Sequence, residues 1–138
     1  RVSQGESIVH LKNLSAPNGH AIEARITAET PLENFRPSPG KITTWHTPNG
    51  DGIRVDTYCE ENCVIPPFYD SLIAKVIAHA PTRRDAIKKL SQCLNDLVIE
   101  GIDTNINFLL ELLKQDTFVN EHHNTGTIDQ MLNSHANR

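Results

Sequence analysis

One basic side chain, Arg25, stands in a pattern that can support chemistry. It lies in the segment Gly19–Glu29, where apolar and polar residues alternate: Ile22, Ala24, Ile26 and Ala28 against Glu23, Arg25, Thr27 and Glu29. A period of two predicts a half-buried β-strand. Because a strand fixes the backbone root of the side chain, the planar guanidinium can be aimed at an anion or at developing negative charge. The alternative is that Glu23 and Arg25 belong to a solvated strand face.

A carboxylate, Asp70, is the second polar residue with a candidate role. It follows the stiff run Pro66–Tyr69 and precedes the mostly apolar segment Leu72–Ala80. Burying a carboxylate without a partner costs several kcal/mol. Arg25 is its natural partner, and pairing would also fix the plane of the guanidinium. The alternative is that Asp70 only caps the beginning of the strand that follows.

The first half of the chain is predicted to consist of strands and turns. Ile8–Leu11 is a candidate short edge strand, and Lys41–His46 is rich in β-forming residues. A turn cluster at 47–52, with Asn-Gly and Asp-Gly signals, leads into the alternating segment Ile53–Tyr58, which predicts the second arm of a hairpin. The apolar run Leu72–Ala80 predicts a strand covered on most of both faces.

The second half changes to a helical period. Thr82 is predicted to be the N-cap of a helix, with Asp85 in its first turn, and Thr104 is predicted to cap a second helix. Between the two helices, a short extended run at 98–99 ends at Gly101. The apolar positions are Ala86, Ile87, Leu90, Cys93, Leu94 and Leu97, then Ile106, Leu109, Leu110 and Leu113, then Ile128, Met131 and Leu132. This order predicts the α+β class: a small antiparallel sheet with helices packed on one face.

Composition and charge restrict the classes of protein. The 138 residues suit one domain, and 38% hydrophobic with 22% charged residues is typical of a globular protein. A net charge of -4 without a Lys/Arg run disfavours nucleic acid and anionic membranes as partners. No apolar run is long enough to span a bilayer, and no signal peptide pattern is present. We expect a cytoplasmic protein and, since the chain does not begin with Met, a piece of a longer one.

The cysteines give no clear metal site. Cys59, Cys63 and Cys93 form an odd set without a framework spacing, which predicts reduced thiols. Cys59 and Cys63 have a metal-ligand spacing, but no second Cys/His pair stands at zinc-finger spacing. We therefore expect no metal, and a domain that binds zinc through Cys59, Cys63 and His122-His123 is the weaker alternative. The chain also lacks phosphate-binding glycine loops and a nucleophile elbow, so it needs a partner site to supply a reagent.

Several short motifs come in a fixed order that resembles the C-terminal domain of biotin carboxylase. They are HAIEARITAE at 20–29, PSPGKI at 37–42, GIR at 52–54, PPFYDS at 66–71, EGIDTN at 100–105 and TGTI at 125–128. Biotin carboxylase is the ATP-dependent component of acetyl-CoA carboxylase and of related biotin-dependent carboxylases. The resemblance covers nearly the whole chain and implies a single domain, residues 1–138, without the ATP-grasp domains of the full protein.

The resemblance implies a reaction and a role for Arg25. In this family, ATP and bicarbonate form carboxyphosphate, which delivers carbon dioxide to the ureido nitrogen of biotin. The ATP-grasp domains bind ATP, magnesium and bicarbonate. The strand arginine of the family, here Arg25, reaches the biotin ureido oxygen and is thus implied in both catalysis and biotin binding. Asp70 and Glu23 are expected to support it, and the chain alone is expected to be inactive.

The resemblance also implies contacts beyond the biotin site. Arg54 and Asp96 match positions at the dimer contact, although Asp51 departs from the aromatic residue that some members have there. Thr127 falls where the family places a small apolar side chain against adenine, so Thr127 and Ile128 are expected to make a weak nucleotide contact. The implied partners are the ATP-grasp domains, a biotin carboxyl carrier protein or domain, the carboxyltransferase and a second copy of the chain.

Two further interpretations remain open. The parent protein is either a biotin carboxylase of acetyl-CoA carboxylase, acting in fatty acid synthesis, or the equivalent part of a pyruvate or propionyl-CoA carboxylase. Alternatively, the chain is a non-catalytic interaction module in which Arg54 and Asp96 only join two copies.

Overall fold

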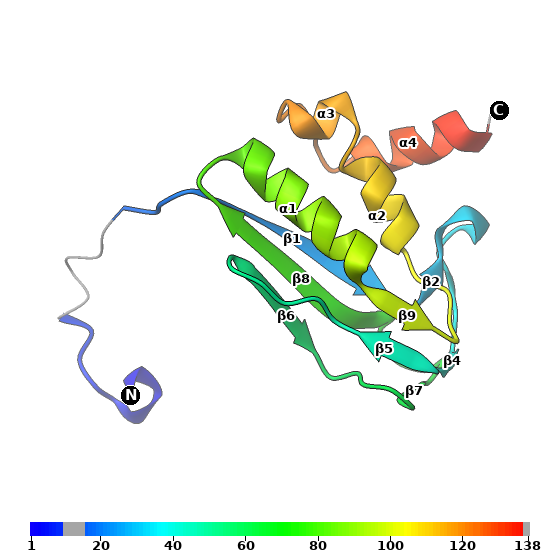
Figure 1. Ribbon diagram of the computed structural model, residues 1–138, viewed down its shortest axis with the longest axis horizontal. Coiled ribbons are helices and arrows are strands. Elements are labelled where there is room, and N and C mark those ends of the chain that lie inside the picture. Colours follow the sequence, from blue (N-terminus) through cyan, green and yellow to red (C-terminus); the bar gives the residue numbers. More distant parts are fainter. Residues whose placement is uncertain (10–15, 137–138) are drawn as a thin grey trace.

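The strand that carries Arg25 belongs to a central sheet. The computed structural model describes residues 1–9 and 16–136, and places three antiparallel strands, β1 (His20–Thr27), β6 (Ile53–Thr57) and β8 (Leu72–Ala80), in the order β1-β8-β6 (Figure 1). β8 is therefore the middle strand, which explains its almost continuous apolar sequence. The predicted edge strand Ile8–Leu11 runs into residues 10–15, outside the described residues.

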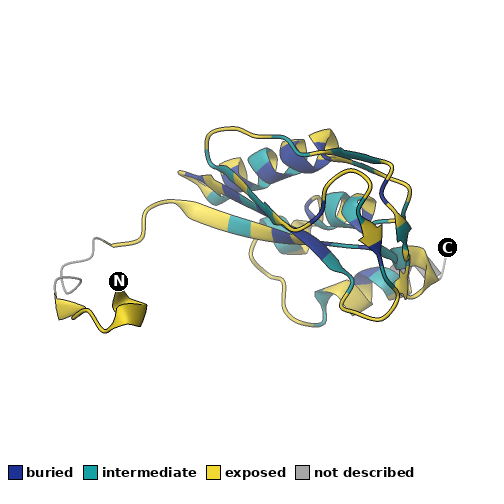
Figure 2. Ribbon diagram, turned by 90° about the horizontal axis from the view of Figure 1, so that it is seen from below, coloured by how far each residue is buried: buried dark blue, intermediate teal, exposed yellow. Residues whose placement is uncertain are grey.

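Helix α1 (Arg83–Asp96) covers one face of this sheet. Thr82 is its N-cap, as predicted, and its hydroxyl accepts a hydrogen bond from the Asp85 N–H at 3.2 Å. The buried residues of α1 are Ala86, Leu90, Cys93 and Leu94, and the last three join buried residues of β1 and β8 in the core. Figure 2 colours the buried residues dark blue. Burying a large aliphatic side chain contributes about 1.5–3 kcal/mol, so Leu90 and Leu94 each stabilise the packing of α1 on the sheet.

Shorter elements extend the core. Three two-stranded pairs are formed by β2 (Glu29–Thr30) with β3 (Arg36–Pro37), β4 (Gly40–Lys41) with β7 (Val64–Ile65), and β5 (Thr44–His46) with β9 (Val98–Glu100). The remaining helices are α2 (Ile106–Leu112), α3 (Asp116–Val119) and α4 (Thr127–Ala136), with 3-10 turns at Val2–Gln4 and Pro31–Glu33. α1 lies over the sheet, and α2, α3 and α4 follow beyond its β1 edge (Figure 1), so the predicted α+β class is confirmed. In the described part of the chain, no helix is long and apolar enough to cross a membrane.

The predicted hairpin that ends with Ile53–Tyr58 is wrong. The preceding strand β5 pairs with β9, with Trp45 opposite Ile99, whereas β6 pairs with β8. The turn itself is present, and the carbonyl of Gly52 accepts a hydrogen bond from the His79 N–H at 2.7 Å. That contact leads the chain onto the edge of β8, where the apolar side of β6 packs against the core. Alternation predicts strands, but it does not say which strands pair.

Helix α2 begins one residue later than predicted. Its N-cap is Asn105 rather than Thr104, and the Asn105 side chain makes no capping hydrogen bond. This amide instead contacts β1. The loop before α2 starts at Gly101, whose φ of +96° is rarely adopted by residues with a side chain, and a Cβ there would meet the Lys41 carbonyl. Glycine is therefore required where β9 ends.

Candidate functional site

Arg25 lies on the open face of the central sheet, opposite α1. Its neighbours Ala24 and Ile26 are buried in the core, and the alternation along β1 turns Arg25 to the other side. The side chain is exposed, and within residues 1–9 and 16–133 its guanidinium makes no hydrogen bond or ion pair. Since a guanidinium has five N–H donors, this group is ready to receive an oxygen-bearing ligand.

A hollow of about 440 Å³ lies beside this guanidinium. Its walls are formed by Arg25, Tyr58, Pro66, Tyr69, Asp70 and Leu72. Tyr58 is 62% exposed and Tyr69 is 82% exposed, so the two rings form an open rim and not a packed core. Partial burial, with Cys59 and Asp70 nearby, raises the pKa of the Tyr58 hydroxyl. This phenol therefore keeps its proton at neutral pH and can donate a hydrogen bond.

The structure brings Asp70 to the same hollow but does not pair it with Arg25. Among the described residues no ion pair joins the two, so the predicted pairing is not formed. Instead, Asp70 Oδ1 accepts a hydrogen bond from the Leu72 N–H at 2.8 Å, which is the alternative role as a cap for β8. Because Asp70 is exposed, no burial penalty requires a cationic partner.

The backbone around Arg25 is held by side chains that the sequence analysis did not single out. Asn105 Oδ1 accepts from the Thr27 N–H at 2.9 Å, and Asn105 Nδ2 donates to the Arg25 carbonyl at 3.0 Å. The Glu29 carboxylate accepts from Thr27 Oγ1 at 2.8 Å and from Ser71 Oγ at 2.6 Å. Together these contacts join the end of β1 to the loop before α2 and to the start of β8. The last residues of three of the sequence motifs are Glu29, Ser71 and Asn105. Their place in these motifs is the feature of the sequence that could have indicated a role for them.

Arg54, predicted at the dimer contact, lies on the same open face. The strand register gives two rows across the sheet: Glu23, Ile77 and Arg54, then Arg25, Lys75 and Asp56. Arg54 donates to both carboxylate oxygens of Asp56, with Nε–Oδ1 at 2.9 Å and Nη2–Oδ2 at 2.6 Å. These hydrogen bonds lower the pKa of Asp56 and raise that of Arg54. The predicted supporting residue Glu23 thus shares a row with Arg54, while Lys75 is the direct neighbour of Arg25.

The other predicted contact residues lie elsewhere. Asp96, at the end of α1, borders a hollow of about 610 Å³ that residues 46–49 also line. Thr127 and Ile128 begin α4, which lies beyond the β1 edge of the sheet (Figure 1). Ile128 is 40% exposed and is thus accessible to a ligand.

The cysteines and histidines of the zinc alternative are not brought together as a ligand set. The sulfurs of Cys59 and Cys63 are 3.9 Å apart, but the His123 ring packs on Phe118 with centroids 4.9 Å apart. No group of three or more His, Cys, Asp or Glu in the described residues is placed to hold a metal ion. Burial, with Cys63 nearby, raises the pKa of the Cys59 thiol to about 11, so it stays protonated at neutral pH.

Comparison with known proteins identifies the family. Residues 23–130 match the family described as the biotin carboxylase C-terminal domain. The chain belongs to this family. The resemblance of the sequence motifs is therefore confirmed, and the matched residues of this biotin carboxylase C-terminal domain include Arg25, its hollow and Asn105.

The relatives of this biotin carboxylase C-terminal domain are longer proteins. Biotin carboxylase 1 of Bacillus subtilis is 50% identical over 111 residues, which cover 80% of this chain and 25% of that protein. The chloroplastic biotin carboxylase of Arabidopsis thaliana is 41% identical over 120 residues, or 87% and 22% of the two chains. The solved biotin carboxylase domain of a thermophilic 2-oxoglutarate carboxylase, bound to bicarbonate, superposes with a TM-score of 0.81 at 36% identity, over 83% of this chain and 26% of that one. The chain thus spans about a quarter of the length of these relatives.

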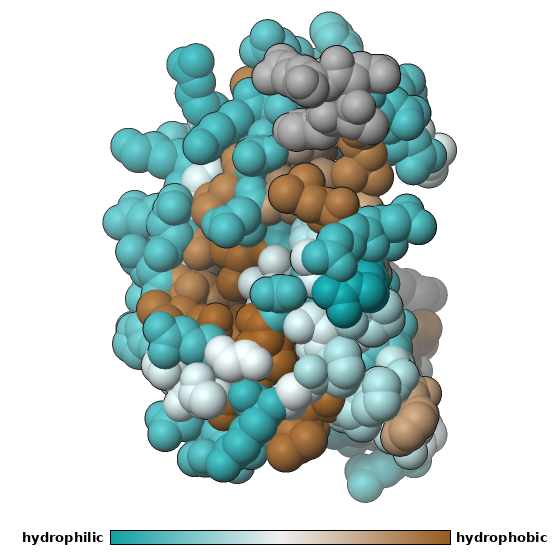
Figure 3. All heavy atoms as spheres, turned by 90° about the vertical axis from the view of Figure 1, so that its right-hand side faces the viewer, coloured by the Kyte–Doolittle hydropathy of each residue, from teal (hydrophilic) through white to brown (hydrophobic). Residues whose placement is uncertain are grey.

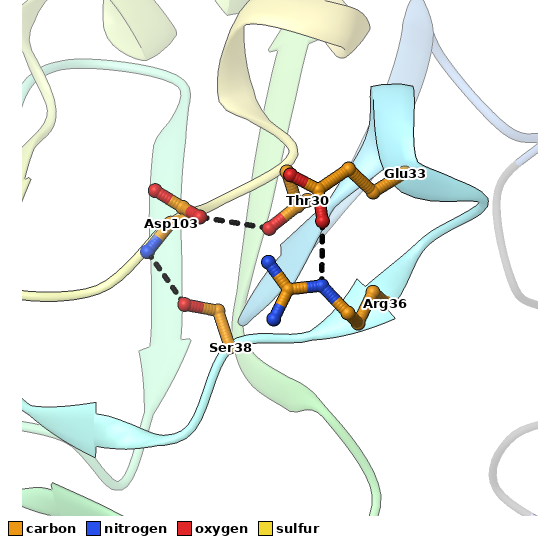
Figure 4. Close-up of polar contacts among 5 residues, drawn as sticks. All are labelled: Thr30, Glu33, Arg36, Ser38 and Asp103. Atoms are coloured by element: carbon orange, nitrogen blue, oxygen red, sulfur yellow. Dashed lines mark hydrogen bonds and ion pairs between the residues drawn. The ribbon is translucent and has the colours of Figure 1, made fainter.

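A further hollow of the biotin carboxylase C-terminal domain, of about 390 Å³, lies between the segment 30–32 and α2. Apolar side chains gather on the side of the molecule shown in Figure 3. Next to this hollow, Thr30 Oγ1 donates to Asp103 Oδ2 at 2.7 Å, and the Asp103 N–H donates to Ser38 Oγ at 2.9 Å (Figure 4). These contacts fix the loop 101–105, which carries Asn105, against β2 and the segment after β3.

Proposed function

We propose that this chain is the C-terminal part of an enzyme that uses ATP and bicarbonate to carboxylate the ureido nitrogen of protein-bound biotin, and that Arg25 contacts the ureido oxygen. The observation that carries the proposal is the Arg25 guanidinium. It is exposed, has no ion-pair partner in the described part of the chain, and extends from an anchored strand beside a hollow. On its own the domain is expected to be inactive.

The hollow suits a flat ring with one polar oxygen. The guanidinium offers planar donors at one side, and the Tyr58 and Tyr69 rings offer apolar faces at the rim. When bound, biotin supplies the ureido nitrogen that is carboxylated. As that nitrogen loses its proton, negative charge develops on the ureido oxygen, and a fixed guanidinium stabilises this charge. Lys75, across the strand from Arg25, adds positive potential at the same place.

The remaining parts of the reaction are proposed to come from the rest of the enzyme. ATP, Mg²⁺ and bicarbonate would bind to ATP-grasp domains of the same chain, with a weak nucleotide contact from Thr127 and Ile128. A biotin carboxylase domain of Hydrogenobacter thermophilus 2-oxoglutarate carboxylase has been solved as a dimer with MgADP, ADP and bicarbonate. In this chain, Phe68 is 86% exposed and Tyr69 is 82% exposed, which supports a cover from another part of the protein.

We propose acetyl-CoA carboxylase as the parent complex, with this reaction as the first step of fatty acid synthesis in the cytoplasm. The resemblance of the motifs supports this choice, and a relative with 50% identity is named biotin carboxylase 1, which gives the reaction on biotin and not the acceptor. A pyruvate or propionyl-CoA carboxylase stays the alternative, because a pyruvate carboxylase component of Methanothermobacter thermautotrophicus is 39% identical over 94% of this chain and 26% of its own length. A biotin carboxyl carrier protein would bring biotin, and the carboxyltransferase would take the carboxyl group onward. Transfer assays with acetyl-CoA, propionyl-CoA and pyruvate as acceptors discriminate between these parents.

Arg54 and Asp96 are proposed to belong to a homodimer surface. Arg54 stands on the outer strand β6 with its side chain 73% exposed, so a second copy can reach it. Sedimentation of the full-length protein tests this proposal. Arg54→Glu should weaken the dimer, whereas a dimer of unchanged dissociation constant would remove Arg54 from the interface.

The decisive experiment replaces Arg25 in the full-length protein. Arg25→Ala should fold and bind ATP as the wild type does, and should lose biotin carboxylation by about 100- to 1000-fold, the usual effect of removing one such donor. The control is Arg36→Ala, because Arg36 is also exposed but pairs with Glu33 at 2.6 Å on β3, away from the hollow. Normal turnover of Arg25→Ala would refute the role, and would favour the interaction-module alternative.

A further inference from the structure

Asn105 completes the outer edge of β1 at Arg25. β1 has β8 on one side in the sheet, and backbone polar groups point alternately to the two sides of a strand. On the outer side, Asn105 Oδ1 accepts from the Thr27 N–H at 2.9 Å and Nδ2 donates to the Arg25 carbonyl at 3.0 Å. The Asn105 N–H also donates to the Thr27 carbonyl at 3.2 Å. A single residue thus makes the contacts that a neighbouring strand would make.

These contacts fall where β1 is least determined by its sheet. The register between β1 and β8 shifts between Ile26 and Thr27, so the regular ladder is interrupted one residue after Arg25. Without the Asn105 side chain, the Arg25 carbonyl and the Thr27 N–H would lose their partners, and only the backbone bond to the Thr27 carbonyl would remain. The direction of a strand side chain follows its backbone, and a displacement of about 1 Å at a reacting group can reduce a rate by about a hundredfold.

Asn105 is itself firmly held. It is 7% exposed, and its carbonyl accepts the first hydrogen bond of α2, from the Leu109 N–H at 3.0 Å. Two residues earlier, Asp103 ties the same loop to Thr30 and Ser38 (Figure 4). The side-chain amide does not cap its own helix. Its donor and its acceptor are both used on the strand that carries Arg25.

We propose that Asn105 is a positioning residue for Arg25: it fixes the backbone root of the guanidinium, so that the fork meets the biotin ureido oxygen. This inference rests on the proposed function of Arg25. It assigns a role in the biotin site to a residue on a different element, the N-cap of α2.

A double-mutant cycle in the full-length carboxylase tests the inference. Asn105→Ala should lower kcat/KM for free biotin by about tenfold or more, with the affinity for ATP unchanged. In the Arg25→Ala background the same substitution should change kcat/KM by less than about twofold, because its effect passes through Arg25. The stability control is Thr82→Ala, which removes the cap at the far end of α1 and should leave kcat/KM for biotin unchanged.

A second variant separates the donor of the Asn105 side chain from its acceptor. Asn105→Asp keeps the acceptor for the Thr27 N–H, but it replaces the donor to the Arg25 carbonyl with a carboxylate oxygen. Because this carboxylate is buried and faces a carbonyl, the free energy of unfolding should fall. Measured where unfolding curves show both proteins fully folded, kcat/KM for biotin should still be lower than in the wild type. Hydrogen exchange gives a readout without catalysis: the Thr27 amide should exchange faster in Asn105→Ala, while the β8 amides that bond to β6 stay protected.

The outcomes are distinct. Equal losses from Asn105→Ala with and without Arg25, or an unchanged exchange rate at Thr27, would overturn the positioning role while leaving the function of Arg25 intact. Normal turnover of Arg25→Ala alone would overturn the proposed function, and the inference with it.

Discussion

Arg25 and Arg54 lie on the same open face of one sheet, yet they are held in opposite ways. The guanidinium of Arg25 has no ion-pair partner in the described residues, whereas its backbone carbonyl is bonded by Asn105. The guanidinium of Arg54 is occupied by both oxygens of Asp56, two residues along β6. Arg25 therefore has an anchored backbone and an unpaired guanidinium, whereas the guanidinium of Arg54 is paired with a carboxylate.

The difference separates a group built for a ligand from a group that is satisfied within the domain. A cation that must stabilise charge appearing during a reaction has to be in place beforehand, because reorganisation during the reaction would reduce its effect. Anchoring the backbone of Arg25 holds the guanidinium in place beforehand and leaves its N–H donors available for the ligand. A cation already paired with a carboxylate must exchange that partner before it can bind another, which suits a surface contact better than catalysis.

The largest expected effect tests whether biotin carboxylation needs the planar guanidinium at Arg25 but not at Arg54. Arg25→Lys keeps the charge but loses the planar donors, so we expect kcat/KM for biotin to fall by roughly a hundredfold. Arg54→Lys, the matched change on the same face, should alter it by less than about twofold. Steady-state kinetics of the full-length enzyme measures both values. Equal losses would mean that the two arginines do not differ in the way described.

The second prediction concerns the anchor that Arg54 lacks. Glu29 accepts hydrogen bonds from Thr27 at 2.8 Å and from Ser71 at 2.6 Å, and it is half-buried. Glu29→Ala removes both, and should reduce the free energy of unfolding by about 1–2 kcal/mol and raise the KM for biotin. Glu29→Gln is the control, since an amide can contact both hydroxyls and should behave as the wild type does. Denaturant unfolding and the KM for biotin are measured for both variants. If Glu29→Ala changed neither the free energy of unfolding nor the KM, Glu29 would not anchor this end of β1.

The main elements of the fold could be predicted from the sequence, because local patterns determine them. The alternation of β1, the apolar run of β8 and the Thr82 cap of α1 all appear where expected. The pairing of β6 with β8 instead of β5 could not be predicted, since it depends on contacts between segments far apart in the chain. Asn105 was missed for the same reason: its partners lie 78 and 80 residues away.

The third prediction concerns a buried thiol next to the Arg25 hollow, after the end of β6 that lies opposite Arg54. Cys59 follows Tyr58 of the hollow, and burial, with Cys63 nearby, raises its pKa from 9.0 to about 11. A buried neutral thiol binds its proton more tightly in the folded state, so its stabilising effect is complete below the unfolded pKa and is lost as the pH rises toward 11. Stability measured from neutral to alkaline pH should fall less steeply in Cys59→Ala. An identical slope in both proteins would contradict the buried thiol.

The smallest expected effect is at Asp56, the partner of Arg54. The pair is exposed, so Asp56→Asn should leave the thermal midpoint at neutral pH unchanged within error. The hydrogen bond from Arg54 holds the pKa of Asp56 below its ordinary 3.8, so any stabilisation by the pair is present above that pKa and lost as the pH falls through the lower, folded value. Wild type and variant should therefore differ even less in acid.

The same variant has a consequence at the dimer surface. Asp56→Asn frees the Arg54 guanidinium from its partner on β6, so an acid on a second copy of the chain no longer competes with Asp56 for it. We expect sedimentation to give a tighter dimer for Asp56→Asn and a weaker one for Arg54→Glu. If Asp56→Asn were markedly less stable and its dimer dissociation constant were unchanged, the Arg54–Asp56 pair would serve the fold and not the dimer. The side chain of Arg54, like the backbone of Arg25, would then be held in place by contacts within the domain.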